Sequence, residues 1–198
     1  MTNISKLKKI IIAGLLLATT IVLNRFLSVK TPVLVVSFSF IPVMLSGILL
    51  GPWWTMAVAG LADLIGALLF PFGSYFVGYT ISAVVSGFIY GMFLQKKFNT
   101  TKKRFIINLV ISTLLVLIIC NAGLNSLWIH ITLKKAIWVI LPTRLLKQLI
   151  MLPIQVVSIF FIDLGLEKIG VYKKLADSEE IIDPEDNEKS KEKNNDKV

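Results

Sequence analysis

The chain has 198 residues, of which 55% are hydrophobic, and its mean hydropathy of +0.77 is too high for a soluble domain of this size. Its net charge of +9 does not indicate nucleic-acid binding, because the basic residues gather at the ends of apolar stretches, where they report membrane topology. Charges are absent from residues 31–62 and 64–95, and each stretch exceeds the roughly 20 residues that one membrane-spanning helix needs. We expect an all-α membrane domain of six transmembrane helices over residues 1–174, followed by a disordered, polar, acidic cytoplasmic tail over residues 175–198.

The first predicted helix covers residues 8–26. No convincing small-x-small cleavage site follows its apolar run, so we interpret it as a retained span rather than a signal peptide. Gly14 and Ala18 lie one turn apart and form a small face that lets a partner helix approach closely, although a lipid-facing helix with chance small residues is the alternative. Arg25 lies near the far end, where it either snorkels to the membrane interface or faces a binding cavity.

The next stretch combines an apolar loop with two helices. Residues 28–39 form a loop or strand-like segment that we interpret as an ordered lid rather than a soluble linker. A short helix is predicted over residues 40–50, and a third helix over residues 54–69 follows the Gly51–Pro52 break. Asp63 is the only charge in this third helix, and an acid at membrane depth indicates either a functional group or a carboxyl that bonds a neighbouring helix.

A Pro71/Gly73 turn separates the third helix from a fourth, predicted over residues 75–94. Two aromatics, Tyr75 and Phe76, open this helix, and a row of small residues follows them. Such rows permit close helix packing in lipid. An ordinary membrane hairpin would carry the same Pro and Gly signals, so the turn alone is not specific.

A fifth helix is predicted over residues 105–131. Asn121, Asn125 and Trp128 are spaced four and three residues apart and therefore share one helical face. His130 is the only histidine in the chain and lies at the interfacial end of the helix. A single histidine does not make a metal site, so no metal is expected.

The sixth predicted helix covers residues 136–169 and carries a polar face. Arg144, Lys147 and Gln148 share this face at three- and four-residue spacing. Two cations so far from the helix end, with no acid beside them in the sequence, are costly unless a water-filled cavity or an anion meets them. Pairing with Asp63 is the alternative, but it would leave one cation over.

Basic residues predict the topology. With six helices and a cytoplasmic N-terminus, the cytoplasmic ends hold eleven basic residues and the outer ends hold four, as the positive-inside rule requires. The C-terminus is then cytoplasmic too. The lid segment, the turn near residue 71 and the polar faces of the last two helices converge toward the outer side, as a cavity open to the outside requires.

Four stretches resemble one family of membrane proteins. They are F-P-F-G-S-Y-F-V-G-Y-T-I-S-A at residues 70–83, G-F-I-Y-G at 87–91, L-N-S-L-W at 124–128 and P-T-R-L-L-K-Q-L-I-M-L-P-I at 142–154. Together they resemble the vitamin-binding S components of energy-coupling-factor (ECF) transporters and, within these, the folate group. The resemblance covers about residues 8–170 and is strongest in the fourth helix.

The resemblance implies a multi-pass plasma-membrane protein with an outer-side cavity that captures folate. Such a subunit associates with a transmembrane T component and two ABC-type ATPases, and Gly14 and Ala18 match the face that contacts the T component. The resemblance implies a transport subunit without a catalytic residue or cofactor of its own. The chain contains no Walker A sequence, so ATP hydrolysis is expected in the partner subunits.

The polar and aromatic residues suit the chemistry of folate. Cations bind its glutamate carboxylates, side-chain amides match the donors and acceptors of its pterin, and aromatic rings stack on its flat rings. The expected substrate-binding residues are the cations Arg25, Arg144 and Lys147, the amides Asn121 and Asn125, and the aromatics Tyr75, Tyr79 and Trp128. The residues alone leave open which of them contacts which end of the ligand.

Two other functions stay open on the residues alone. The substrate of such a subunit could be pantothenate, riboflavin or a queuosine precursor, although a pair of buried cations favours an acid and argues against riboflavin. A membrane-embedded enzyme would need a nucleophile, base or metal cluster at the membrane face. The candidates Asp63, Asp163 and His130 lie instead on different helices and at different predicted depths.

Overall fold

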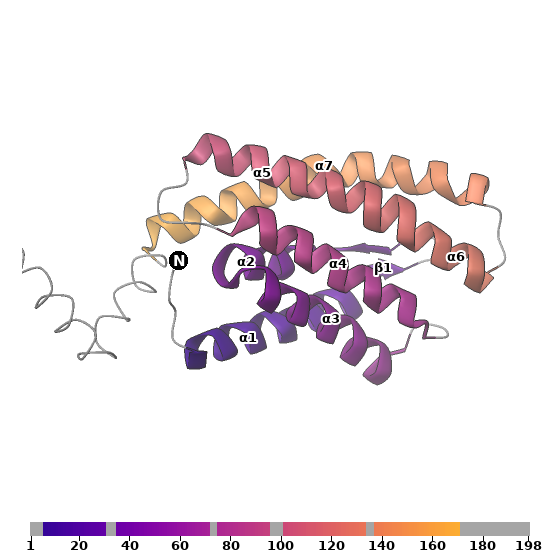
Figure 1. Cartoon of the computed structure of the whole chain (residues 1–198), viewed down its shortest axis with the longest axis horizontal. Helices are drawn as coiled ribbons and strands as arrows, with labels where there is room; N and C mark the ends of the chain where they lie inside the picture. Colours follow the sequence, from indigo (N-terminus) through magenta and orange to yellow (C-terminus); the bar gives the residue numbers. More distant parts are fainter. Residues whose placement is uncertain (1–5, 31–34, 72–74, 96–100, 134–136, 171–198) are drawn as a thin grey trace, which may run out of the picture.

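The computed structural model describes residues 6–30, 35–71, 75–95, 101–133 and 137–170 (Figure 1). The expected acidic tail lies outside these residues, as do Gly73 of the predicted turn and several basic residues used for the topology. Along the chain the elements are α1 (Lys6–Arg25), β1 (Ser28–Lys30), β2 (Val35–Ser37), α2 (Phe40–Leu50), α3 (Pro52–Leu69), α4 (Val77–Leu94), α5 (Lys102–Leu115), the π-helix η1 (Val116–Leu124), α6 (Asn125–Leu133) and α7 (Ile137–Lys168).

The helices form an elongated bundle that is consistent with the predicted six-helix membrane fold. Among the described residues, five helical stretches are long and apolar enough to cross a membrane, and α2 is a shorter apolar helix. The continuous rod α5–η1–α6 runs beside α7 along one side of the molecule, and α1 and α3 lie toward the opposite side (Figure 1). Met44, Leu94 and Ile159 are fully buried in the core between them, whereas large apolar side chains such as Trp53 and Phe161 point outward, as expected of a surface that lipid contacts.

Glycines allow α3 and α4 to pack backbone to backbone. A Cβ atom on Gly87 would lie 2.7 Å from the carbonyl oxygen of Thr55, and one on Gly91 would lie 2.3 Å from Cα of Pro52. The break between α2 and α3 depends on Gly51, whose φ of 84° favours glycine and allows Pro52 to start the next helix. Two of the small residues predicted to permit close packing, Gly87 and Gly91, therefore do so against α3, whereas Gly78 packs against the rings of Phe76 and Trp128.

The segment between α1 and α2 contains a short antiparallel pair of strands, in agreement with the strand-like segment predicted there, while its role as a lid stays a prediction. Strand β1 pairs with β2 so that Ser28 lies opposite Ser37 and Val29 opposite Val36. The Ser37 hydroxyl donates to the carbonyl of Leu23 at 3.1 Å, which ties β2 to the end of α1. The pair of strands is thus anchored to the end of α1.

The fifth helix differs from the single regular α-helix that its sequence predicts. It begins at Lys102 and changes to π-helical geometry over Val116–Leu124, where the backbone N–H of Asn125 bonds the carbonyl of Cys120, five residues earlier. The wider turn displaces the carbonyl of Asn121, and Arg144 from α7 donates to this oxygen at 3.0 Å. A donor from another helix therefore bonds a carbonyl of the irregular turn, and π-helical turns of this kind are frequent at functional sites.

Candidate ligand-binding cavity

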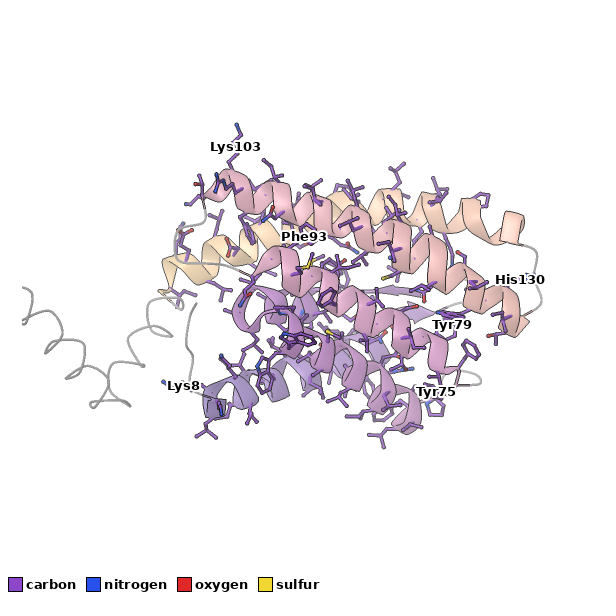
Figure 2. The ribbon with its side chains drawn as sticks, viewed as in Figure 1. Lys8, Tyr75, Tyr79, Phe93, Lys103 and His130 are labelled. Atoms are coloured by element: carbon purple, nitrogen blue, oxygen red, sulfur yellow. The ribbon has the colours of Figure 1, made fainter. Side chains whose placement is uncertain are left out.

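A cavity of about 640 Å³ lies between α1, α3, α4, the η1–α6 segment and α7, and its size suits a small organic ligand. Tyr75 and Tyr79, which line it, lie with His130 toward one end of the molecule, whereas Lys8 and Lys103 lie at the opposite end (Figure 2). The predicted binding residues that line it are Arg25, Tyr75, Tyr79, Asn121, Asn125, Arg144 and Lys147.

The wall formed by α7 carries the two predicted cations. Arg144 and Lys147 are both partly buried and line the cavity, and Arg144 also donates to the Asn121 carbonyl. Neither cation is paired with Asp63, because the Asp63 carboxylate instead contacts Arg25 of α1 and Thr80 of α4. The sequence alternative of an α7–Asp63 ion pair is therefore wrong, and the α7 wall presents positive charge to the cavity.

Asp63 instead belongs to a chain of polar contacts on the opposite wall. One of its carboxylate oxygens lies 3.9 Å from Nη2 of Arg25, and the other accepts a hydrogen bond from the Thr80 hydroxyl at 2.8 Å. The Tyr75 hydroxyl is 2.9 Å from the same Thr80 hydroxyl. This chain links the end of α1 to α3 and to the start of α4, and it brings Tyr75 to the edge of the cavity.

Arg25 faces the interior rather than snorkelling outward. Its side chain is only 10% exposed, and it donates to the backbone carbonyls of Asp63 and Phe70, each at 3.3 Å. A Cβ atom on Gly66 would come within 2.7 Å of Nε of Arg25, so a glycine there makes room for the guanidinium. Of the two positions that the sequence left open for Arg25, the structure has the one at the cavity.

The amide pair on the η1–α6 segment lines the cavity as a unit. Nδ2 of Asn125 lies 3.4 Å from Oδ1 of Asn121 and donates to it. Within the described part of the chain, the remaining donor and acceptor positions of both amides have no protein partner and can meet the polar edge of a ligand. The helical spacing predicted that these two side chains lie together, and they do so across the π-helical turn.

Trp128 shares their predicted face but is not among the residues that line the cavity. Its indole Nε1 donates to Ser82 at 3.0 Å, and its ring lies 5.5 Å from that of Phe76. A Cβ atom on Gly78 would be 2.6 Å from the indole, so the ring packs closely on the start of α4. In this structure Trp128 joins α6 to α4 beside the cavity.

The inner part of the cavity contains polar residues that the sequence analysis did not select. Gln155 and Ser82 are buried, and Ser86 is partly buried. Gln155 follows Gln148 by seven residues, or two helical turns, and Gln148 lies in turn one helical turn after Arg144. Extending the polar face of the last helix by this spacing would have found it.

The proposed partner-docking residues lie away from the cavity, on the outside of α1. Gly14 and Ala18 are exposed, and no atom of the described chain lies within 4 Å of a Cβ built on Gly14. Ala13 faces inward and is buried. Within the described residues, no cluster of three or more metal-binding side chains occurs, and His130 is exposed.

Comparisons with known proteins agree with this architecture. The family model described as "ECF transporter, substrate-specific component" matches residues 8–162. The chain is 36% identical over 171 residues to the folate transporter FolT of Clostridium novyi, a match that covers 86% of this chain and 96% of that protein. It is also 36% identical over 160 residues to the folate transporter FolT of Leuconostoc mesenteroides, covering 78% and 84% of the two chains.

A solved structure has the same fold. The crystal structure of FolT bound with folic acid superposes with a TM-score of 0.68 and 37% sequence identity, covering 77% of this chain and 89% of that one. The matched family is a component of a transporter and not an enzyme, and the apolar helices make the chain a multi-pass membrane protein. The chain therefore belongs to the family of substrate-specific components of ECF transporters.

Proposed function

We propose that this protein is the folate-binding subunit of an ECF-type importer. The observation that carries the proposal is the cavity itself, in which two cations of α7, an amide pair and two tyrosines meet. Relatives of similar length that are named folate transporters, and a related structure bound with folic acid, support folate as the ligand.

The parts of the cavity match the parts of the ligand. Arg144 and Lys147 supply charge-assisted hydrogen bonds for the glutamate carboxylates, which need positive donors away from bulk water. Asn121 and Asn125 offer both donors and acceptors to the polar groups of the ligand. Tyr79 lines the cavity and provides an aromatic face for a flat ring.

The protein captures its ligand at the outer membrane surface in this proposal. The positive-inside rule places both termini in the cytoplasm, and the labelled lysines Lys8 and Lys103 lie at the end of the molecule opposite Tyr75 and Tyr79 (Figure 2). The cavity then faces the outer side. A membrane-embedded T component and two ABC-type ATPases, which supply the ATP hydrolysis, complete the importer.

Helix α1 is the proposed contact with the T component. Its exposed small face, Gly14 and Ala18, lets another helix approach closely, and exposed Leu15 and Ile11 flank this face. In lipid such close approach contributes more to helix pairing than hydrophobic burial does.

The ligand that copurifies with the protein tests the proposal. The protein is purified in detergent from cells grown in rich medium, and the bound small molecule is identified by its absorbance spectrum. A pterin-like band is expected. A flavin band, or pantothenate found by mass spectrometry, would assign the subunit to a different vitamin.

Titration of ligand-free protein provides the second arm of this test. Folic acid is titrated into the protein by calorimetry, with riboflavin and pantothenate under the same conditions. Binding of folic acid alone is expected. Binding of either competitor in its place contradicts the proposal.

A further inference from the structure

Two buried polar atoms of cavity-lining residues have no hydrogen-bond partner among the described residues: Nε of Arg25, whose other nitrogens are bonded, and Oε1 of Gln155. Gln155 on α7 is 8% exposed and lines the cavity, yet among the residues that the structure describes its Oε1 has no hydrogen-bond partner. Buried amide oxygens are nearly always paired, because leaving one without a partner costs free energy. This oxygen therefore indicates a donor that comes from outside the chain.

The position of Gln155 places this donor far from the cations. Arg144, Gln148, Met151 and Gln155 recur at helical spacing and all line the cavity, so they form one stripe along α7. Eleven residues, about three helical turns, separate Arg144 from Gln155, which corresponds to roughly 16 Å along the axis. The α7 wall of the cavity thus has a cationic end and a neutral end.

The neutral end is built from buried core residues. Tyr90, Cys120 and Met151 line the cavity and belong to the main hydrophobic core cluster. An ionised carboxylate can only accept hydrogen bonds, so it cannot satisfy the oxygen of Gln155. The group bound there must carry N–H or O–H donors and must be flat or apolar enough to enter the core.

We propose that Gln155 is the specificity-determining acceptor for the N–H donors of the ligand's heterocycle. An elongated ligand then lies along α7, with its carboxylates at Arg144 and Lys147 and its ring at Gln155. The amide Nε2 of the same side chain is a donor for a ring nitrogen or carbonyl, so one glutamine matches the alternating donors and acceptors of a pterin edge. This inference rests on the proposed function, because it assigns an orientation to folate.

Replacement of Gln155 by methionine separates a binding role from a structural one. Methionine has a similar length and no oxygen, so it removes the unpartnered acceptor while keeping the volume of the side chain. We expect the ligand-free Gln155→Met protein to melt at or above the wild-type temperature and to bind folic acid about tenfold more weakly. A merely structural glutamine would give the opposite, a lower melting temperature with unchanged affinity.

Asn108→Leu is the matched control. Asn108 is a partly buried amide outside the cavity that donates to the Phe93 carbonyl at 3.2 Å, so its replacement should lower the melting temperature without changing folic acid binding. Gln155→Glu is the second variant, which retains an accepting oxygen. It should bind folic acid more tightly than Gln155→Met, and equal binding by the two variants overturns the proposal.

A truncated ligand tests the orientation. p-Aminobenzoylglutamate retains the carboxylates of folic acid and lacks the pterin, and its affinity is measured by displacement of labelled folic acid. Gln155→Met should weaken folic acid but not p-aminobenzoylglutamate, whereas Arg144→Leu should weaken both. Equal losses for the two ligands in Gln155→Met would overturn the inference.

The outcomes also separate this inference from the proposed function. Failure of the wild-type protein to bind folic acid contradicts the proposed function itself. Wild-type protein that binds folic acid, together with a Gln155→Met variant of unchanged affinity, overturns only the role of Gln155.

Discussion

Replacing Arg144 with leucine should weaken folic acid binding strongly without unfolding the protein. Arg144 lies on the cavity wall, partly buried, and one of its nitrogens already donates to the Asn121 carbonyl at 3.0 Å. A guanidinium has five N–H donors, so donors remain for a carboxylate of the ligand. Leucine keeps most of the apolar volume of the side chain and removes all of these donors.

The size of the effect follows from the kind of hydrogen bond that is lost. A hydrogen bond to a charged group contributes about 1.5–3 kcal/mol, and 2 kcal/mol corresponds to roughly a 30-fold increase in Kd. Binding should not disappear, because Lys147 remains on the same wall. Arg144→Lys should have an intermediate Kd, since lysine keeps the charge but not the planar fork of donors.

Titration calorimetry on purified protein measures the effect, with Arg104→Leu as the matched control. Arg104 is exposed near the start of α5 and does not line the cavity, so its replacement removes the same charge from the protein and should leave Kd unchanged. The melting temperatures of the Arg144 variants show how much the hydrogen bond from Arg144 to the Asn121 carbonyl contributes to stability. Wild-type affinity in Arg144→Leu would refute the reasoning, because Arg144 would then serve only the Asn121 carbonyl.

Three further predictions follow from packing and charge. Asp63→Asn should lower stability by about 2 kcal/mol, between the values for exposed and buried ion pairs, and Arg25→Met should cost less in that background than in the wild-type protein, because only its bonds to backbone carbonyls remain to be lost; additive losses in thermal unfolding would mean that the two side chains do not interact. Gly14→Leu with Ala18→Leu should leave folic acid affinity intact and abolish copurification with the T component and ATPases; a wild-type yield of complex would place the docking surface elsewhere. Gly91→Ala should destabilise the fold by about 2 kcal/mol or more through its clash with α3, whereas Gly14→Ala, which meets no atom within 4 Å, should not lower the melting temperature; equal melting temperatures would contradict the packing described.

Local sequence patterns predicted much of the fold correctly. The predicted second helix, residues 40–50, has the observed bounds of α2, because Gly51 and Pro52 end one helix and start the next by backbone chemistry alone. The polar face of Arg144 and Lys147 also lines the cavity as predicted, since both residues lie on one helix, whose geometry fixes their relation.

Contacts between distant segments could not be read from the sequence. Arg25 and Asp63 are 38 residues apart on different helices, and only the packing of α1 against α3 brings them together. The π-helical turn has the same origin, because it accompanies a hydrogen bond from Arg144 on α7 to the Asn121 carbonyl, which no local propensity encodes. Trp128 packs on Gly78 and Ser82 of α4 for the same reason.

A structure of this protein with folic acid bound tests the central claim most directly. The account predicts density for the ligand in the cavity along α7, with its glutamate carboxylates within hydrogen-bonding distance of Arg144 and Lys147 and its pterin at Gln155. A ligand in the reversed orientation, or one bound outside this cavity, would contradict it.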